Sequence, residues 1–389
     1  MRSRYWAAQA ARVFLITTLT AGSLRADERT YKDLYVLQLS APITVDPSSD
    51  QEAADGGQVV SEAIGAATDH DEHAMLWSSA SGSAIDLNPR GFTSTIAMGT
   101  DGSLQVGDGS AGTDRPDHAM LWYGTAASAV DLNPLGFTTS IAYGTDASEE
   151  VGSGTKIGNV NHALLWRGSA KSAIDLNPKG FTASVANGTN GKRQIGEGLG
   201  TATGMLNHAL FWSGAASSVV DLNPTDLAGF RSSFGLGIGG WEEVGYGVTR
   251  NRSHQALLWH GSAASAVDLN PTGFAFSVAS GTNGSQQVGY GYGRATDDDQ
   301  HALLWSGSAD SYVDLGALLP SKFTESFAFS INAAGDVFGY AQEASGAYDA
   351  IEWREPTTDT SAPEPGGVSV FAIWTIALQR RRRRDNAVA

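Results

Sequence analysis

The sequence of 389 residues contains no cysteine. That absence excludes a disulfide framework and any zinc site built on thiolates. Basic residues are also scarce, with 25 Lys and Arg against 41 Asp and Glu. The resulting net charge of −16 repels phosphate backbones, so nucleic-acid binding is not expected. Nucleophile elbows, phosphate loops and metal-binding helices are missing as well, which lowers the expectation of an enzyme.

Two apolar segments near the chain ends are too short to span a bilayer as a simple helix. Near the N-terminus, Arg2, Arg4 and Arg12 precede the apolar run Val13–Ala21, and small residues follow it. That order predicts a secretory signal peptide over residues 1–26, with an N-terminal helix of the folded domain as the alternative.

The C-terminal tail has a Pro-Glu-Pro motif, an apolar segment over residues 366–378 and a run of arginines. It resembles the PEP-CTERM sorting signals of Gram-negative bacteria, which a membrane protease called exosortase processes near Pro-Glu-Pro. The resemblance implies an exosortase-type partner, only transient membrane contact, and delivery to the cell envelope, outer surface or extracellular space. The alternative is a basic tail that only solvates its own charge. The residues implied in sorting are Pro363, Glu364, Pro365, Arg380, Arg381, Arg382, Arg383 and Arg384.

Seven tryptophans recur at intervals of 44 to 48 residues, and each closes a copy of a motif such as HALLW. A period of about 40–50 residues is typical of propeller blades and stacked repeats. Each copy contains four strand-like pieces, which predicts a seven-bladed β-propeller of four-stranded antiparallel blades over residues 27–355, with an open β-solenoid as the alternative. Residues 356–365 form a linker, and residues 366–389 form the sorting segment. The repeated tryptophans are Trp77, Trp122, Trp166, Trp212, Trp259, Trp305 and Trp353.

The seventh copy lacks its fourth strand, because Trp353 is followed by Pro356 and a polar linker. The N-terminal segment Tyr35–Leu39 has the pattern of a fourth strand. We therefore expect this segment to complete the seventh blade and remove the open sheet edge. The first piece of each copy is rich in Ser, Ala and Gly, as the crowded axis of a ring requires.

The repeats resemble the HAF family of probable extracellular repeats, named for a His-Ala-Phe triplet before Leu-Trp. Here the triplet is His-Ala-Met or His-Ala-Leu, and the resemblance spans Gln58–Trp353. It implies an exported protein and carries no defined activity.

Histidines and aspartates recur once in most copies, which places them at separate points of a ring. We expect each histidine to bond a neighbouring backbone group, and each aspartate to accept backbone N–H groups in its DLNP turn. No catalytic residue and no metal ligand is expected among them. The repeated histidines are His73, His118, His162, His208 and His301, and the repeated aspartates are Asp86, Asp131, Asp175, Asp221, Asp268 and Asp314.

The loop of the sixth copy departs most from the other copies. Its tyrosines and charges are a candidate site for a sugar, and its three adjacent aspartates are a candidate for calcium, although their spacing lacks the alternate-ligand pattern of an EF-hand loop. The alternative is a solvated polar loop. Other departures, Glu149-Glu150, Lys192-Arg193 and Trp241-Glu242-Glu243, lie near hairpins, where adjacent carboxylates point apart and make poor acid/base pairs. The candidate ligand-binding residues are Tyr290, Tyr292, Arg294, Asp297, Asp298 and Asp299.

The sequence thus favours an exported, non-enzymatic binding or structural module, with polysaccharide or a surface protein as its candidate partner. The alternative is a propeller-borne glycan hydrolase or lyase. An enzyme needs unlike residues at the axis, whereas the copies are expected to place Ser, Ala, Gly and Thr there almost uniformly.

Overall fold

The computed structural model describes strand segments 33–37, 43–45 and 53–55, then residues 58–65, 68, 71–78, 84–112, 117–227, 229–346 and 348–354. The predicted signal peptide, the linker and the sorting tail with Pro363, Glu364, Pro365 and Arg380–Arg384 lie outside these residues. The chain divides into two units, Met1–Pro356 and Thr357–Ala389, and every described residue belongs to the first. Within the described ranges, no helix is long and apolar enough to cross a membrane.

The described residues form seven antiparallel sheets, which we number as blades 1 to 7 in chain order. Blade 1 contains β2 (Ile43–Val45), β3 (Ala53–Asp55), β4 (Gln58–Gly65), β5 (Glu72–Ser78) and β6 (Ala84–Asp86). Blade 2 contains β7 (Ser94–Thr100), β8 (Gln105–Ser110), β9 (His118–Trp122) and β10 (Val130–Asp131). Blade 3 contains β11 (Phe137–Asp146), β12 (Glu149–Lys156), β13 (Val160–Trp166) and β14 (Ile174–Asp175). Blade 4 contains β15 (Phe181–Thr189), β16 (Gln194–Gly200), β17 (His208–Trp212) and β18 (Val220–Asp221).

The last three blades repeat this arrangement. Blade 5 contains β19 (Phe230–Gly239), β20 (Glu242–Thr249), β21 (His254–Trp259) and β22 (Val267–Asp268). Blade 6 contains β23 (Phe274–Thr282), β24 (Gln287–Gly293), β25 (His301–Trp305) and β26 (Val313–Asp314). Blade 7 contains β27 (Phe323–Ile331), β28 (Val337–Glu343), β29 (Tyr348–Arg354) and β1 (Asp33–Leu37). Single 3-10 turns connect strands: η2 (Ala126–Ser128), η3 (Ala170–Ser172), η4 (Thr201–Thr203), η5 (Ala216–Ser218), η6 (Ala263–Ser265), η7 (Arg294–Thr296), η8 (Ala309–Ser311) and η9 (Gly316–Leu318).

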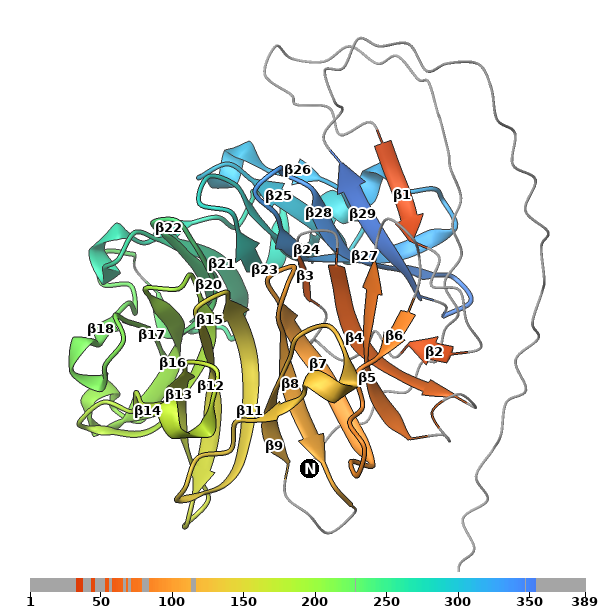
Figure 1. The fold of residues 1–389 in the computed structure, drawn as a ribbon. Coiled ribbons are helices and arrows are strands. Elements are labelled where there is room, and N and C mark those ends of the chain that lie inside the picture. Colours follow the sequence, from red (N-terminus) through yellow and green to blue (C-terminus); the bar gives the residue numbers. More distant parts are fainter. Residues whose placement is uncertain are drawn as a thin grey trace, which may run out of the picture. The chain divides into compact units, whose positions relative to one another are not determined.

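The first strands of the blades form a closed ring, because each contacts the first strand of the next blade and β27 contacts β3 (Figure 1). Glycine permits this approach: a Cβ on Gly99 of blade 2 would lie 2.6 Å from the Tyr143 carbonyl oxygen of blade 3. The expected small residues near the axis are therefore confirmed for these positions. The chain is a seven-bladed β-propeller and not an open solenoid.

The N-terminal strand closes the ring, as the sequence predicts. β1 pairs with β29, with Leu34 opposite Trp353 and Val36 opposite Ile351. In Figure 1, β1 (red) and β29 (blue) are neighbours although they come from opposite ends of the described chain. The strand begins two residues before the predicted Tyr35–Leu39 and ends at Leu37.

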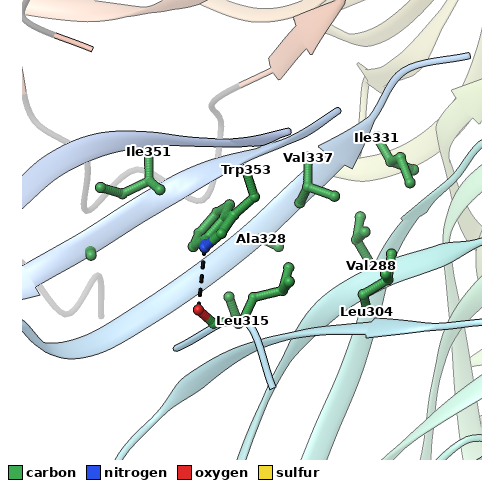
Figure 2. Close-up of a cluster of buried hydrophobic side chains, with 10 residues drawn as sticks. Val288, Leu304, Leu315, Ala328, Ile331, Val337, Ile351 and Trp353 are labelled. Carbon is green, nitrogen blue, oxygen red and sulfur yellow. Dashed lines mark hydrogen bonds between the residues drawn. The ribbon is translucent and has the colours of Figure 1, made fainter. Parts of the chain in front are cut away.

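The repeated tryptophans pack between blades. Trp353 of blade 7 is 1% exposed and belongs to one buried hydrophobic cluster with Val288 and Leu304 of blade 6 (Figure 2). Its indole Nε1 donates a hydrogen bond to the Leu315 carbonyl oxygen at 3.2 Å. Burying side chains of this size stabilises each junction by about 2–3 kcal/mol, which explains why the motif recurs once per blade.

A second glycine in every copy but the first allows the first and second strands to pair closely. In blades 2 to 7, a Cβ on the first glycine of the V-G-x-G pattern, or its equivalent, would lie 1.8 to 2.0 Å from a carbonyl oxygen of the first strand. Blade 1 has Ser61 at this position, and its inner strand is divided there, with β3 pairing to residues 58–60 and β2 to residues 63–65. The Ser61 Cβ explains why the inner strand cannot continue past it.

Gly245→Ala should lower the free energy of unfolding by about 2 kcal/mol, because overpacking against backbone separates paired strands. The added Cβ would lie 1.9 Å from the Phe234 carbonyl oxygen. Gly261→Asn is a matched control in the same blade, since Gly261 has φ +75° and open space around its Cβ position. Asparagine tolerates that conformation. Denaturant unfolding of both variants checks the prediction. A Gly245→Ala variant with the same free energy of unfolding as wild type would contradict it.

Candidate functional site

The most regular residues of the repeat form bonds between blades. The Ala74 backbone N–H of blade 1 donates to Thr95 Oγ1 of blade 2 at 3.0 Å, and that hydroxyl donates to Asn88 Oδ1. Since these groups hold the ring together, their recurrence has a structural explanation. The same backbone-to-hydroxyl bond recurs from Ala119 to Ser140, Ala163 to Ser184, Ala209 to Ser233, Ala256 to Ser277 and Ala302 to Ser326.

The repeated histidines bond aspartate side chains of their own blades, so the expectation of a backbone partner is wrong. His73 Nδ1 lies 2.8 Å from Asp86 Oδ2, because strand pairing places β6 beside β5. The aspartate expectation is confirmed, since the Asn88 N–H donates to Asp86 Oδ1 at 2.7 Å. The other pairs are His118–Asp131, His162–Asp175, His208–Asp221 and His301–Asp314.

Blade 5 breaks this pattern. Gln255 occupies the histidine position, and His254, one residue earlier, lies between the rings of Tyr246 and Phe276 at 4.6 and 4.9 Å. Burial lowers the pKa of His254, so the neutral ring is favoured there. Burial raises the pKa of Asp268, the aspartate of this blade.

The paired carboxylates near the hairpins bond neighbouring blades. Glu149 Oε1 of blade 3 accepts hydrogen bonds from Thr189 Oγ1 and Gln194 Nε2 of blade 4, both at 2.6 Å. Blades 5 and 6 repeat this arrangement, and blades 1 and 2 use a glutamine as the acceptor. These residues connect blades in pairs. The corresponding bonds are Thr282 and Gln287 to Glu242, and Thr100 and Gln105 to Gln58.

The six candidate residues of the sixth copy occupy two different settings. Tyr290 and Tyr292 are partly exposed on β24, where they contact other aromatic rings. Arg294 begins η7, and the exposed Asp297, Asp298 and Asp299 form the following turn.

The aspartate turn has a local explanation. Thr296 Oγ1 accepts the Gly293 N–H, and Asp297 and Asp298 have φ values of 55° and 69°. Blade 4 has the same loop conformation without acids, with Gly204 and Met205 at φ 61° and 65°. No group of three or more acidic, histidine or cysteine side chains suited to a metal ion occurs among the residues that the structure describes.

The structure reveals a stronger candidate, the variable residue of V-G-x-G on each second strand. The aromatic residues of blades 5, 6 and 7 at this position contact their neighbours in one continuous chain of rings, which we call the aromatic arc. Ring centroids lie 4.8 Å apart for Phe234–Tyr246, 5.1 Å for both Phe276–Tyr292 and Tyr290–Phe327, and 4.6 Å for Phe327–Tyr340. The aromatic arc consists of Phe234, Tyr246, His254, Phe276, Tyr290, Tyr292, Phe327, Tyr340 and Tyr348.

Blades 2 to 4 carry polar residues at the equivalent position. We call these residues, together with the polar side chains that contact them, the polar arc. Asn187 Nδ2 donates to Glu197 Oε2 at 2.6 Å, and burial raises the pKa of Glu197 to about 7. Burial also raises the pKa of Tyr143, which interacts with the charges of Asp108 in blade 2 and Glu197 in blade 4. The polar arc consists of Asp108, Tyr143, Ser153, Asn187 and Glu197.

The expected uniform lining of the axis by small residues is therefore incomplete. The small residues occupy the close contacts between first strands, while side chains around them differ strongly between the two halves of the ring. The signal was present in the sequence as the changing fourth letter of QVGDG, EVGSG, QIGEG, EVGYG and QVGYG. Reading it requires strand register, which shows that these letters are equivalent points of one ring.

The fold and this ring of equivalent positions define a β-propeller with a two-sided candidate binding site. No protein-family model and no curated protein sequence matches the chain. The fold is similar to a puromycin hydrolase (TM-score 0.53, 12% identity), covering 78% of this chain and 51% of the hydrolase. It is also similar to the β-propeller domain of the Trilobed protease from Pyrococcus furiosus (TM-score 0.52, 8% identity), covering 78% of this chain and 94% of that domain. This chain thus spans about half the length of the hydrolase, and at these identities the similarities show the fold alone.

Proposed function

We propose that the protein is an exported, non-enzymatic binding module that holds a neutral glycan of the envelope or extracellular space between the aromatic and polar arcs. The observation that carries this proposal is the division of one ring of equivalent positions into an aromatic half and a polar half. The expected signal peptide and PEP-CTERM-like tail support export, with an exosortase-type protease as processing partner.

The two arcs match the two kinds of surface on a sugar ring. The C–H face of a pyranose is apolar and packs against the electron-rich face or edge of an aromatic ring. Its hydroxyl groups need hydrogen-bond partners, which an amide, a phenol and an un-ionised carboxyl can provide. The net charge of −16 disfavours acidic glycans, so a neutral chain is the better match.

Tyr246→Ala and Tyr292→Ala should each weaken glycan binding about tenfold, because each removes about 1.4 kcal/mol of contact with the sugar ring. Affinity electrophoresis of the full chain in gels containing β-glucan, galactomannan or dextran measures the effect. Tyr123→Ala is the matched control, since Tyr123 directly follows β9, is 53% exposed and lies outside both arcs. Equal retardation of all three variants and wild type would reject the aromatic arc as the site.

A second candidate function, hydrolysis or elimination of a glycan, is favoured by Glu197. A carboxyl with a pKa of about 7 retains its proton near neutral pH and can act as a general acid. Release of reducing ends or of unsaturated products in the same assays, lost in Glu197→Gln, would establish this alternative over simple binding.

A further inference from the structure

Among the residues that the structure describes, one tryptophan does not follow the structural pattern of the seven repeated ones. Trp241 is 73% exposed, whereas the repeated tryptophans are at most 3% exposed. It lies in the hairpin between β19 and β20, at the end of the blade opposite to the η4 and η7 loops. An exposed indole has no role in the packing between blades that buries the others.

The hairpin that carries Trp241 is held by its neighbours. Asn190 Nδ2 of blade 4 donates to the Gly240 carbonyl oxygen at 3.0 Å. On the other side, a Cβ on Gly239 would lie 2.3 Å from the Thr282 carbonyl oxygen of blade 6. Because backbone on both sides limits its movement, this hairpin presents the indole with little loss of conformational entropy on binding.

One face of the indole is covered by a guanidinium group. The Arg193 guanidinium carbon of blade 4 lies 3.7 Å from the Trp241 ring centroid and 5.4 Å from that of Phe211. Arg193 is therefore stacked between two rings, in a geometry that favours attraction of a cation to an aromatic face. This contact orients the indole and leaves its other face directed to solvent.

A buried carboxylate holds the arginine in turn. Glu243 is fully buried, and its Oε1 has no hydrogen-bond partner and lies 3.7 Å from Arg193 Nη1. Burying a carboxylate is unfavourable, and burial indeed raises the pKa of Glu243. Blades 2, 4 and 6 place an uncharged glutamine at the same position. Blade 3 also has a buried glutamate there, Glu150, but the stack on an exposed ring combines Trp241 and Glu243 of blade 5 with Arg193 of blade 4.

We propose that Trp241 is a second binding platform, which stacks on the C–H face of a neutral sugar ring. The Arg193 guanidinium and the Glu243 carboxylate lie 3.7 Å apart, so each offsets the other's charge behind the exposed ring face. A flat, uncharged, partly apolar ring matches that surface better than an ion. The inference rests on the proposed glycan binding and adds a consequence. Because the aromatic arc lies near the opposite ends of the blades, one protein molecule binds two glycan segments and cross-links glycan chains.

The test compares three forms of the full chain: wild type, Trp241→Ala, and Tyr246→Ala with Tyr292→Ala. Isothermal titration calorimetry with β-glucan oligosaccharides should give two binding sites for wild type and one for each variant. Wild type should raise the viscosity of β-glucan solutions, and both variants should lose this effect. Trp241→Phe keeps a flat ring and should restore it in part. In wild type, the emission of the exposed indole should change on binding, and this change should be absent in Trp241→Ala.

The outcomes separate the inference from the proposed function. Unchanged stoichiometry and viscosity in Trp241→Ala, with binding lost in the arc variant, would overturn the second platform and leave the first. Binding lost in Trp241→Ala and retained in the arc variant would support the platform and overturn the arc. Failure of wild type to bind any neutral glycan in either assay would overturn both.

Discussion

A chain that begins at Ser40, and therefore lacks β1, should melt roughly 5–10 °C below the full chain. β1 forms five residue pairs with β29, and their loss leaves the edge beside Trp353 open to water. Each lost backbone hydrogen bond costs about 1 kcal/mol, and newly exposed apolar surface adds to this. We therefore expect the free energy of unfolding to fall by about 5 kcal/mol. Differential scanning calorimetry of the two chains measures the shift.

A chain that begins at Lys32 is the control, because it is shortened at the same end but retains β1. It should melt with the full chain. If the chain beginning at Ser40 also melted with the full chain, the closure of the ring by β1 would be excluded as a source of stability.

Glu197→Gln should stabilise the protein by about 3 kcal/mol at pH 8 and leave its stability at pH 4 unchanged. Burial raises the Glu197 pKa from 4.5 to about 7, so the folded protein binds a proton there that the unfolded chain releases. Wild-type stability therefore falls as pH rises from about 4.5 to 7, and the full penalty is present above pH 7. Glutamine carries no charge at any pH and removes this dependence.

Urea unfolding between pH 4 and pH 8 provides the measurement, and Glu72→Gln provides the control, since Glu72 is an exposed carboxylate on β5. The variant and wild-type curves should separate between pH 4.5 and 7 for Glu197→Gln only. Parallel curves for the two variants would show that Glu197 ionises normally in the folded state. Asp108 and Tyr143 are the other titratable groups nearby, and both remain in the variant.

The architecture could be predicted from sequence because its determinants are local and repeat with the chain. Each buried Trp, such as Trp122, closes a short apolar strand that is visible in a single copy. The closure by β1 followed from a strand missing after Trp353, although its exact bounds depended on pairing with β29.

The candidate site could not be predicted in the same way, because it is made of contacts between copies. His254 stands one residue before the histidine position of the other copies, and only its place between Tyr246 and Phe276 shows its role. The bond between His73 and Asp86 was equally hidden, since both were read as separate ring positions until strand pairing joined them. Arg193, Trp241 and Glu243 were recognised as departures, but their stacking depends on blades 4 and 5 being adjacent.

The hydrogen bonds near the hairpins join the blades two by two. For these contacts the repeating unit is therefore a pair of blades and not a single blade. Gln105, Gln194 and Gln287 donate to the preceding blade, which joins blades 1 with 2, 3 with 4 and 5 with 6. Blade 7 has Val337 at the glutamine position and blade 1 has Val59, and neither valine side chain can donate. An odd ring cannot be divided into pairs, so one blade remains over. That blade is blade 7, which is assembled from both ends of the propeller. If the ancestor arose by duplication of a two-blade unit, a seventh blade of this kind would be needed to close a ring of seven.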